Sequence, residues 1–397
     1  MIWDVVACFV ALPVVAAAAY LAFLALMSRR GPAPPRPGRP ETTFDIIVPA
    51  HNEEGGIAAT VRSLLSIDYP HALFRVVVVA DNCTDGTAER ASAAGATVLI
   101  RHAPAARGKG HALAFAFDHS QREAFADAVV VVDADSVVSP NLLCAFALRF
   151  GAGGAALQAD YGVRNAGASW RTRLMHVAFT AFHTVRSLAR ERMHLSCGLR
   201  GNGMAFSQSL LRAVPHHAFS VVEDVEYGIA LGLAGIRVHY VGDAQVLGEM
   251  CGSERHSRSQ RRRWEDGRSA LTRQYAWPLL SAAVRRRDLM LFDLAADLLT
   301  PPLGQLVAAA TLGLFVCAAA RAFGWPLHAA PWLWAIAMAG IVAYVGRAVV
   351  LSGAGVRAFL DLARAPFYVV WKLMLALRLR GAQTRDWVRT RRAFEAE

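Results

Sequence analysis

The sequence predicts a doubly wound, mostly parallel α/β domain with membrane-spanning helices on its N-terminal and C-terminal sides. Between residues 42 and 135, short apolar runs rich in β-branched residues alternate with stretches of helical length. Long apolar stretches occur near the N-terminus and in the C-terminal third. The formal net charge of +11 accompanies a mean hydropathy of +0.31, a combination that argues against a soluble nucleic-acid-binding protein.

Three apolar stretches are long enough to cross a bilayer, because each approaches the roughly 20 residues that a hydrocarbon core of about 30 Å requires. They lie at residues 5–27, 302–320 and 331–351. The first is predicted to be an uncleaved anchor rather than a signal peptide, since Arg29 and Arg30 follow it instead of a small-residue cleavage site.

Arginine is distributed unevenly around these stretches. Arg29, Arg30, Arg36 and Arg39 follow the first stretch, and the tail beyond residue 371 is rich in arginine, whereas the loop between the other two contains only Arg321. The positive-inside rule therefore predicts that residues 30–300 and the C-terminus are cytoplasmic, in a multi-pass protein of the cell inner membrane. The six widely spaced cysteines contain no CxxC pair and agree with a reducing compartment.

The remaining segments complete a four-part division of the chain. Residues 1–28 are the expected anchor, residues 29–41 a linker rich in proline and glycine, and residues 42–287 the cytoplasmic α/β domain. Residues 288–397 are the expected C-terminal membrane region with two spans and a basic tail. Within it, residues 288–300 and 356–380 are predicted to be amphipathic helices in the membrane interface, with ordinary core helices as the alternative.

The runs FDIIVPA, RVVVVA, ATVLI and AVVVVDAD are predicted to be strands. Continuous apolar runs are typical of strands buried on both faces, and the stretches at residues 55–66, 87–94 and 109–125 are predicted to be helices that make right-handed crossovers. Ligands of such sheets bind beyond the carboxyl ends of the strands. The missing GxGxxG and GxxxxGK[ST] motifs argue against a dinucleotide-dependent dehydrogenase and a P-loop ATPase.

Several acidic residues follow the predicted strands. Asp133 and Asp135 can face one divalent cation, and Mg²⁺ or Mn²⁺ there would neutralise a departing nucleotide diphosphate. An isolated DxD is usually a solvated turn, but the preceding VVVV run favours the metal-binding interpretation. Asp81 and Asn82 are candidates for hydrogen bonds to a nucleobase or ribose, with a simple turn as the alternative.

Three further groups complete the candidate site. Lys109 is a candidate phosphate contact near a helix N-terminus, or part of a flexible basic loop. Glu223 and Asp224 precede an apolar helical stretch. A carboxylate there can act as a general base, or it can simply cap and stabilise the N-terminus of the helix. In QRRRW, residues 260–264, the guanidinium groups can pair with phosphate oxygens, and the indole can pack against a sugar ring. The alternative is that these arginines are attracted to anionic lipid.

Seven segments in this order resemble the family 2 glycosyltransferases, specifically the membrane-embedded branch of cellulose, chitin and hyaluronan synthases. They span about residues 42–300 and are DIIVPAHNEE, ADNCTDGT, RGKGHAL, DAD, GNGMAF, VED and QRRRW. The resemblance implies a GT-A fold, a nucleotide diphosphate sugar donor, a divalent metal ion and inversion at the anomeric carbon. The acceptor side is expected to differ, because Gly198-Leu199-Arg200-Gly201 replaces an aromatic-cysteine sequence.

The resemblance also assigns roles to individual residues. It implies that Asp81 contacts the nucleoside, that Asp133 and Asp135 bind the diphosphate and the metal, and that Asp224, next to Glu223, is the base. Gln260, Arg263 and Trp264 are expected to shape the diphosphate and acceptor site, and Glu53 and Lys109 are expected donor contacts.

These observations predict a hexosyltransferase of envelope or exopolysaccharide synthesis that uses a UDP-sugar and Mg²⁺ or Mn²⁺. Its expected acceptor is a glycan or a polyprenyl-lipid-linked sugar, and membrane lipids are expected partners. Synthesis of a β-glycan polymer and addition of a single sugar both remain open. A non-catalytic membrane scaffold or a sugar-nucleotide sensor is the alternative from another class.

Overall fold

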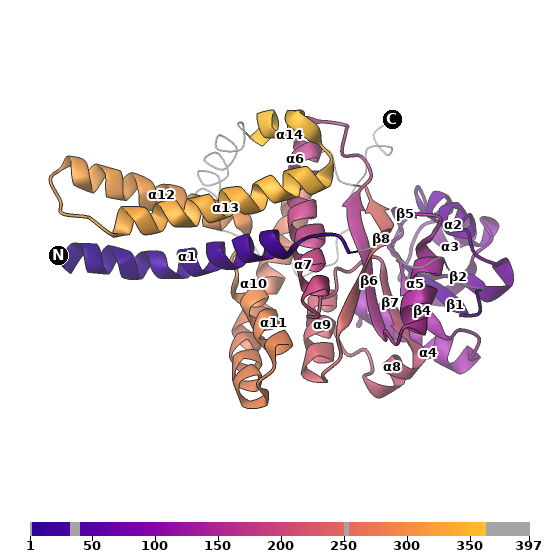
Figure 1. The fold of residues 1–397 in the computed structure, drawn as a ribbon. Coiled ribbons are helices and arrows are strands. Elements are labelled where there is room, and N and C mark those ends of the chain that lie inside the picture. Colours follow the sequence, from indigo (N-terminus) through magenta and orange to yellow (C-terminus); the bar gives the residue numbers. More distant parts are fainter. Residues whose placement is uncertain (1, 32–39, 250–253, 363–397) are drawn as a thin grey trace.

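A computed structural model describes residues 2–31, 40–249 and 254–362, with the helical backbone alone for residues 254–262. Figure 1 shows an α/β domain at one end of the molecule and long helices that extend away from it. These helices are α1 (Ile2–Met27), α12 (Leu303–Ala322) and α13 (Ala330–Ser352). The architecture therefore separates a sheet-based domain from an apolar helical region.

The described residues contribute eight strands to one sheet. They are β1 (Phe44–Ala50), β2 (Phe74–Asp81), β3 (Thr97–Arg101), β4 (Ala128–Val131), β5 (Ser136–Val138), β6 (Ala156–Val163), β7 (Met204–Ser207) and β8 (Val238–Gly248). Their order is β3-β2-β1-β4-β7-β6-β8-β5. The first four in this order are parallel, β7 is antiparallel to both neighbours, β6 and β8 are parallel, and β5 is antiparallel to β8. The predicted strands are confirmed, and the mixed half of the sheet is new.

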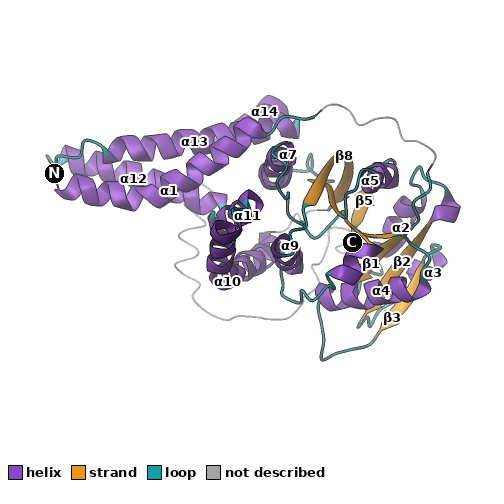
Figure 2. Ribbon diagram, turned by 60° about the horizontal axis from the view of Figure 1, so that its bottom comes forward, coloured by secondary structure: helices purple, strands orange, loops and turns teal. Residues whose placement is uncertain are grey.

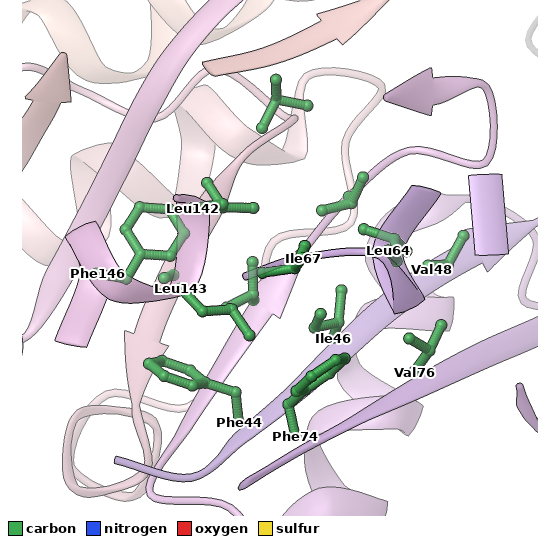
Figure 3. Packing of buried hydrophobic residues seen from close by; sticks show 14 of the residues in the cluster. Phe44, Ile46, Val48, Leu64, Ile67, Phe74, Val76, Leu142, Leu143 and Phe146 are labelled. Carbon is green, nitrogen blue, oxygen red and sulfur yellow. The ribbon is translucent and has the colours of Figure 1, made fainter. Parts of the chain in front are cut away.

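Alternate side chains of β1 enter two hydrophobic layers. Ile46 and Val48 pack on one face with Leu64 and Phe146, as Figure 3 shows. Ile47 points to the other face, into the layer that contains Leu113. All six side chains are almost inaccessible to solvent. A strand buried on both faces has no polar side, which explains the uninterrupted apolar run in the sequence.

Helices cover both faces of the sheet (Figure 2). One layer contains α2 (Ile57–Leu65), α3 (Thr87–Ala93) and α5 (Leu142–Gly151), and the other contains α4 (Lys109–Glu123), α8 (Gln208–Ala213) and α9 (Glu223–Leu233). A short 3₁₀ turn, η1 (His71–Leu73), precedes β2. The three helices predicted between the first strands are confirmed.

A continuous helical segment follows β6. It consists of α6 (Trp170–Phe179), a π-helical stretch η2 (Thr180–Val185) and α7 (Arg186–Arg192). Ser169 begins it with a capping box, because its hydroxyl accepts the N–H of Thr172 while the Thr172 hydroxyl accepts the N–H of Ser169. π-helical turns are rare and often mark functional sites.

The two helices α10 (Glu254–Arg286) and α11 (Leu289–Leu299) form a hairpin that runs across the direction of the long apolar helices (Figure 1). Asp288 caps α11 by accepting the N–H groups of Met290 and Leu291 at 2.8 and 3.3 Å. Leu289 and Phe292 are exposed on α11. The segment predicted at residues 288–300 is thus a helix, and its place in the membrane interface stays a prediction.

The helices α1, α12 and α13 are each long and apolar enough to cross a membrane, as the sequence predicts for this part of the chain. The carboxylate of Asp4 accepts the N–H groups of Ala329 and Ala330, both at 3.0 Å, at the end remote from the domain. At the domain end, Nε of Arg347 donates to Oγ of Ser28 at 3.0 Å. These polar contacts fix α1 against α13 at both ends.

Parts of three predicted segments lie outside the described residues. They are residues 32–39 of the linker, most of the predicted interface helix at residues 356–380, and the basic tail. The described start of that interface helix is α14 (Gly355–Leu362).

Candidate active site

The carboxyl ends of β1, β2 and β4 meet at one edge of the sheet, because these strands are adjacent and parallel. Ala50, at the end of β1, faces Ala80 in β2. Asp81 ends β2, Asp133 follows β4, and Glu53 lies in the loop after β1. The candidate donor residues therefore leave the sheet on the side where α/β proteins bind ligands.

Lys109 connects three parts of this edge. Its Nζ lies 2.5 Å from Oδ1 of Asp133, 2.5 Å from the carbonyl oxygen of Gly201 and 3.8 Å from Oε1 of Glu223. Burial alone would lower the pKa of Lys109, but attraction by Asp133 and Glu223 outweighs burial and raises the pKa. Lys109 is thus a fixed positive charge among carboxylates, and the flexible basic loop considered from the sequence is wrong.

A buried amide positions the turn that carries Asp133 and Asp135. Oδ1 of Asn202 accepts the N–H of Asp133 at 3.1 Å, and its Nδ2 donates to Oγ of Ser136 at 2.7 Å. Nε2 of Gln158 donates to the carbonyl oxygen of Asn202 at 2.7 Å. Asn202 and Gln158 are fully buried. Sequence reasoning missed both, although Asn202 lies within the GNGMAF segment.

Asp133 and Asp135 fit a metal ion that is shared with a phosphate ligand. Burial raises the pKa of Tyr161, and the charges of Asp133 and Asp135 raise it further, so both carboxylates lie near this phenol. Within residues 2–31, 40–249 and 254–362, no three His, Cys, Asp or Glu side chains gather as a complete metal cage. Mg²⁺ is commonly held by one or two carboxylates together with substrate phosphates and water.

Asp81 is fully buried, and Oδ1 lies 2.5 Å from NH1 of Arg101 in the neighbouring strand β3. Nδ2 of Asn82 also donates to this oxygen at 3.0 Å. The other oxygen, Oδ2, is buried without a hydrogen-bond partner. An unpaired buried acceptor costs free energy, and a ligand donor would satisfy it.

The first two loops of the edge are joined to each other. The backbone N–H of Glu53 donates to Oγ1 of Thr87 at 2.7 Å, and the carbonyl oxygen of Glu53 accepts the N–H of Ile57 at 3.0 Å. Oδ1 of Asp85 accepts the N–H of Thr87 at 3.1 Å. The turn that was the alternative interpretation of this segment is therefore present beside the candidate nucleoside contact Asp81.

Glu223 and Asp224 occupy the first turn of α9. A Cβ placed on Gly201 would lie 3.3 Å from Oδ2 of Asp224, so a glycine with a φ of 79° allows the loop to approach this carboxylate. Burial raises the pKa of Glu223 to about 8 against the attraction of Lys109, and burial also raises the pKa of Asp224. Raised carboxylate pKa values are typical of general acid–base sites, and the helix dipole favours acids in this turn as well.

The Gln260–Trp264 segment lies in the first half of α10, which passes the start of α9. A Cβ on Gly267 would lie 3.1 Å from Cγ2 of Val222, immediately before Glu223. Trp264 is 38% exposed, and burial lowers the pKa of Arg263. The side chain of Gln260 lies outside the described residues, so its contact with a ligand stays a prediction.

Sequence reasoning missed a buried group that we call the arginine–aspartate junction: Arg186, Arg190, Arg268, Asp293 and Asp297. Arg190 lies 2.7 Å from Asp293 and 2.8 Å from Asp297, and Arg186 lies 2.7 Å from Asp297. NH2 of Arg268 lies 3.4 Å from Oδ2 of Asp297 and also donates to its backbone carbonyl oxygen. The available signal was the spacing of four residues in both Arg186/Arg190 and Asp293/Asp297, which places each pair on one helix face.

The edge combines the groups that a displacement at a phosphorylated carbon requires. Two carboxylates suit a cation, a lysine suits phosphate oxygens, and Asp224 suits removal of a proton. The arginine–aspartate junction lies between the domain and the apolar helices, because Arg186 donates to Tyr344 of α13 and Arg190 donates to Tyr20 of α1.

The sequence has recognisable relatives. Residues 40–267 match the family described as glycosyltransferase like family 2. The probable glycosyltransferase YdaM of Bacillus subtilis is 23% identical over 262 residues, which are 63% of this chain and 60% of that protein. The low-salt glycan biosynthesis hexosyltransferase Agl6 of Haloferax volcanii is 34% identical over 93 residues, which are 23% of this chain and 21% of that protein. The matches span less than two thirds of the length of either relative.

Among solved structures, the mannosyltransferase PcManGT from Pyrobaculum calidifontis, in complex with GDP-Man and Mn²⁺, has a similar fold. It is 19% identical, with a TM-score of 0.54 over 85% of this chain and 97% of that chain. This likeness confirms the predicted GT-A fold, while the cellulose, chitin and hyaluronan synthase branch stays a prediction. Since the family match covers more than half of the chain, this protein belongs to glycosyltransferase family 2.

Proposed function

We propose that the protein transfers a hexose, with inversion, from a nucleotide diphosphate sugar to a glycan or lipid-linked acceptor at the cytoplasmic face of the inner membrane. The observation that supports this most strongly is the contact of Lys109 with Asp133 and Gly201, across sequence separations of 24 and 92 residues. These contacts bring the candidate donor carboxylate and the acceptor loop to one ammonium group. Glu223 and Asp224 lie beside the same group.

In this proposal, Asp224 takes the proton of the acceptor hydroxyl. The hydroxyl oxygen attacks the anomeric carbon from the face opposite the diphosphate, and the bond between that carbon and the diphosphate oxygen breaks with its electron pair on the diphosphate. The raised pKa makes Asp224 a stronger base than an exposed aspartate. Glu223, whose pKa is about 8, keeps its proton near neutral pH and adds no second negative charge.

The other residues act on the donor and the leaving group. Lys109 and Arg263 offset the growing charge of the diphosphate, and Asp81 receives a hydrogen bond from the nucleoside at its unpaired oxygen. Asp133 and Asp135 hold Mg²⁺ or Mn²⁺, which when bound supplies Lewis-acid stabilisation to the diphosphate. Gln260 and Trp264 border the acceptor, and Glu53 borders the donor.

The proposed donor is a UDP-sugar. A GDP-sugar is the second candidate, because the similar mannosyltransferase PcManGT was solved with GDP-Man and Mn²⁺. The proposed topology rests on arginine: Arg29 and Arg30 follow α1 at the domain end, whereas Arg321 is near the remote end of α12.

Membranes that contain the full chain, incubated with radiolabelled UDP-sugars and GDP-sugars, test the proposal. We expect transfer of label from one sugar nucleotide to a lipid or glycan fraction, with a loss on the order of a hundredfold in EDTA that added Mn²⁺ or Mg²⁺ reverses. Transfer that persists undiminished in EDTA would remove the metal role of Asp133 and Asp135. Saturable donor binding without transfer or hydrolysis would favour the sensor alternative, and the length of the product separates polymer synthesis from single addition.

A further inference from the structure

A pocket between α9, α10, α11 and the loop before β7 is lined by three arginines, which we call the arginine pocket. Its charged residues are Arg190, Arg200, Arg268 and Asp297. The rest of its wall is apolar or glycine, including Ile229 and Leu294. The pocket thus brings several charged groups together against an otherwise apolar wall.

The charges around the arginine pocket do not balance among the described residues. Among the described residues, Arg186, Arg190 and Arg268 form ion pairs with Asp293 and Asp297 alone, and Arg200 forms no ion pair but lies within electrostatic range of Asp224, so four arginines face three carboxylates. Arg186, Arg200 and Arg268 also gather on the ring of Phe182, at 4.7, 4.5 and 5.7 Å from its centroid. Clustered guanidinium groups repel one another, so an anion in the pocket would stabilise the arrangement.

Arg200 has the fewest hydrogen-bond and ion-pair partners among these arginines. It is 7% exposed, and its NH2 donates to the carbonyl oxygen of Cys197 at 2.9 Å. Its Nε is buried without a hydrogen-bond partner, and no described carboxylate forms an ion pair with it. A buried donor without an acceptor is costly, and a ligand oxygen would supply the missing acceptor.

The pocket adjoins the apolar helices. NH2 of Arg190 donates to the hydroxyl of Tyr20 in α1 at 2.7 Å, and Nε of Arg186 donates to the hydroxyl of Tyr344 in α13 at 2.9 Å. Figure 1 shows α10 and α11 where the long helices meet the domain. The arginine pocket therefore lies where the domain meets the apolar helices.

The pocket also adjoins the proposed base. Arg200 precedes Gly201, whose added Cβ would lie 3.3 Å from Oδ2 of Asp224, and Val225 lines the pocket directly after Asp224. A group bound by Arg200 thus lies next to the carboxylate that would take the acceptor proton.

We propose that the arginine pocket binds the phosphate of a membrane-borne lipid acceptor and thereby holds the acceptor beside Asp224. This inference rests on the proposed function, since it names the acceptor class of the same reaction. Guanidinium groups suit phosphate because their N–H donors match its oxygens in a fixed geometry. A free phosphate ion shares this chemistry, so the test separates the two sources.

The full chain in phosphatidylcholine nanodiscs provides the binding assay, with a radiolabelled polyprenyl monophosphate as the probe. We expect saturable binding that neutral polyprenol displaces at least about tenfold less effectively, because the charged hydrogen bonds are lost. Equal displacement by polyprenol would overturn the phosphate site. Binding of inorganic phosphate with the affinity of the lipid would overturn the lipid-borne source.

Substitutions in the arginine pocket test whether the probe binds there. Arg200→Gln and Arg268→Gln are each expected to raise the Kd for the probe at least about tenfold, whereas Arg200→Lys, which keeps the charge, raises it less. The matched control is Arg273→Gln, which removes an exposed arginine of the same helix α10 and is expected to change the Kd by less than about twofold. Equal weakening by all three glutamine variants indicates surface attraction only, and no weakening indicates a purely structural cluster; either result refutes the proposal.

Donor binding, measured by calorimetry on the same variants, separates this inference from the proposed function. We expect an unchanged donor Kd, because the arginine pocket lies outside the donor edge. Failure of the unmodified chain to bind the donor would refute the proposed function but not the lipid site. Donor binding without binding of the lipid probe would refute the lipid site alone. Melting temperatures identify misfolded variants, and Arg268→Gln with Arg200→Lys carries the test when Arg200→Gln does not fold.

Discussion

The sheet edge and the arginine–aspartate junction have opposite charge imbalances. At the edge, Asp133, Glu223 and Asp224 surround the single ammonium of Lys109. At the junction, three arginines surround two aspartates, and Arg200 lies next to them. One region therefore suits a cation and the other an anion, and they adjoin where Arg200 precedes the Gly201 loop that reaches Asp224. In the reaction that we propose, the donor and the anionic acceptor would meet at the boundary between the two regions.

The two regions also differ in how they are built. The edge arises from strand ends, whose side chains meet because neighbouring parallel strands end together. The junction arises from helices, and its contacts join Arg190 to Asp293 and Arg186 to Asp297 across 103 and 111 residues. The location of functional residues at strand ends can be predicted from the sequence. The location of functional residues between helices depends on how the helices pack against one another.

The largest expected effect lies at the boundary. Asp224→Asn removes the proposed base while preserving side-chain shape, and we expect kcat to fall by a factor on the order of 10² to 10⁴ with the donor Kd unchanged. The matched control is Glu223→Gln, which mimics the protonated state that a pKa of about 8 maintains near neutral pH. We expect that control to lose less than about tenfold in kcat. Unchanged turnover in Asp224→Asn would remove it as the base.

A smaller effect is expected for a substitution in the arginine–aspartate junction that lowers stability without affecting donor binding. Arg190 is 1% exposed and pairs with two aspartates, so Arg190→Ala should lower the free energy of unfolding by about 3–5 kcal/mol, because the buried Asp293 loses its arginine partner and Asp297 loses one of three. Thermal melting of the full chain measures this loss, and donor binding below the melting temperature should persist.

The surface pair Arg122–Asp118 provides the control for that comparison. Its side chains are 66% and 64% exposed, so Arg122→Ala should change stability by no more than about 0.5 kcal/mol. Similar melting temperatures for Arg190→Ala and Arg122→Ala would contradict the stabilising role of the junction.

The smallest effect is the dependence on pH. A general base acts when it is deprotonated, and burial raises the pKa of Asp224, so kcat/KM should fall as the pH falls through a value above the usual aspartate range of about 4. Each further unit of acidity should reduce kcat/KM about tenfold. The acid limb should persist in Glu223→Gln; its disappearance there would identify Glu223 as the base.

Much of the edge was predictable. Runs such as RVVVVA predict strands because burial on both faces leaves no polar position, and polar residues that follow such runs must lie at the sheet edge. The same reasoning placed Asp81, Asp133 and Lys109 near the edge but did not reveal the partners of Lys109, because Gly201 approaches it from a loop 92 residues away. The sequence also did not predict that β7 pairs antiparallel with β4, because a four-residue strand is too short to show a clear periodicity.

The sequence by itself determined the strands, the apolar helices and the order of the acidic segments, because side-chain periodicity and hydropathy are local properties of the chain. Only the tertiary structure decided that Lys109 pairs with Asp133, that Asn202 supports the Asp133 turn, and that Arg186 and Arg190 meet Asp293 and Asp297. The spacing of four residues in each charged pair specifies a helix face. It does not specify which helix that face meets, because docking depends on the packing of the whole surface.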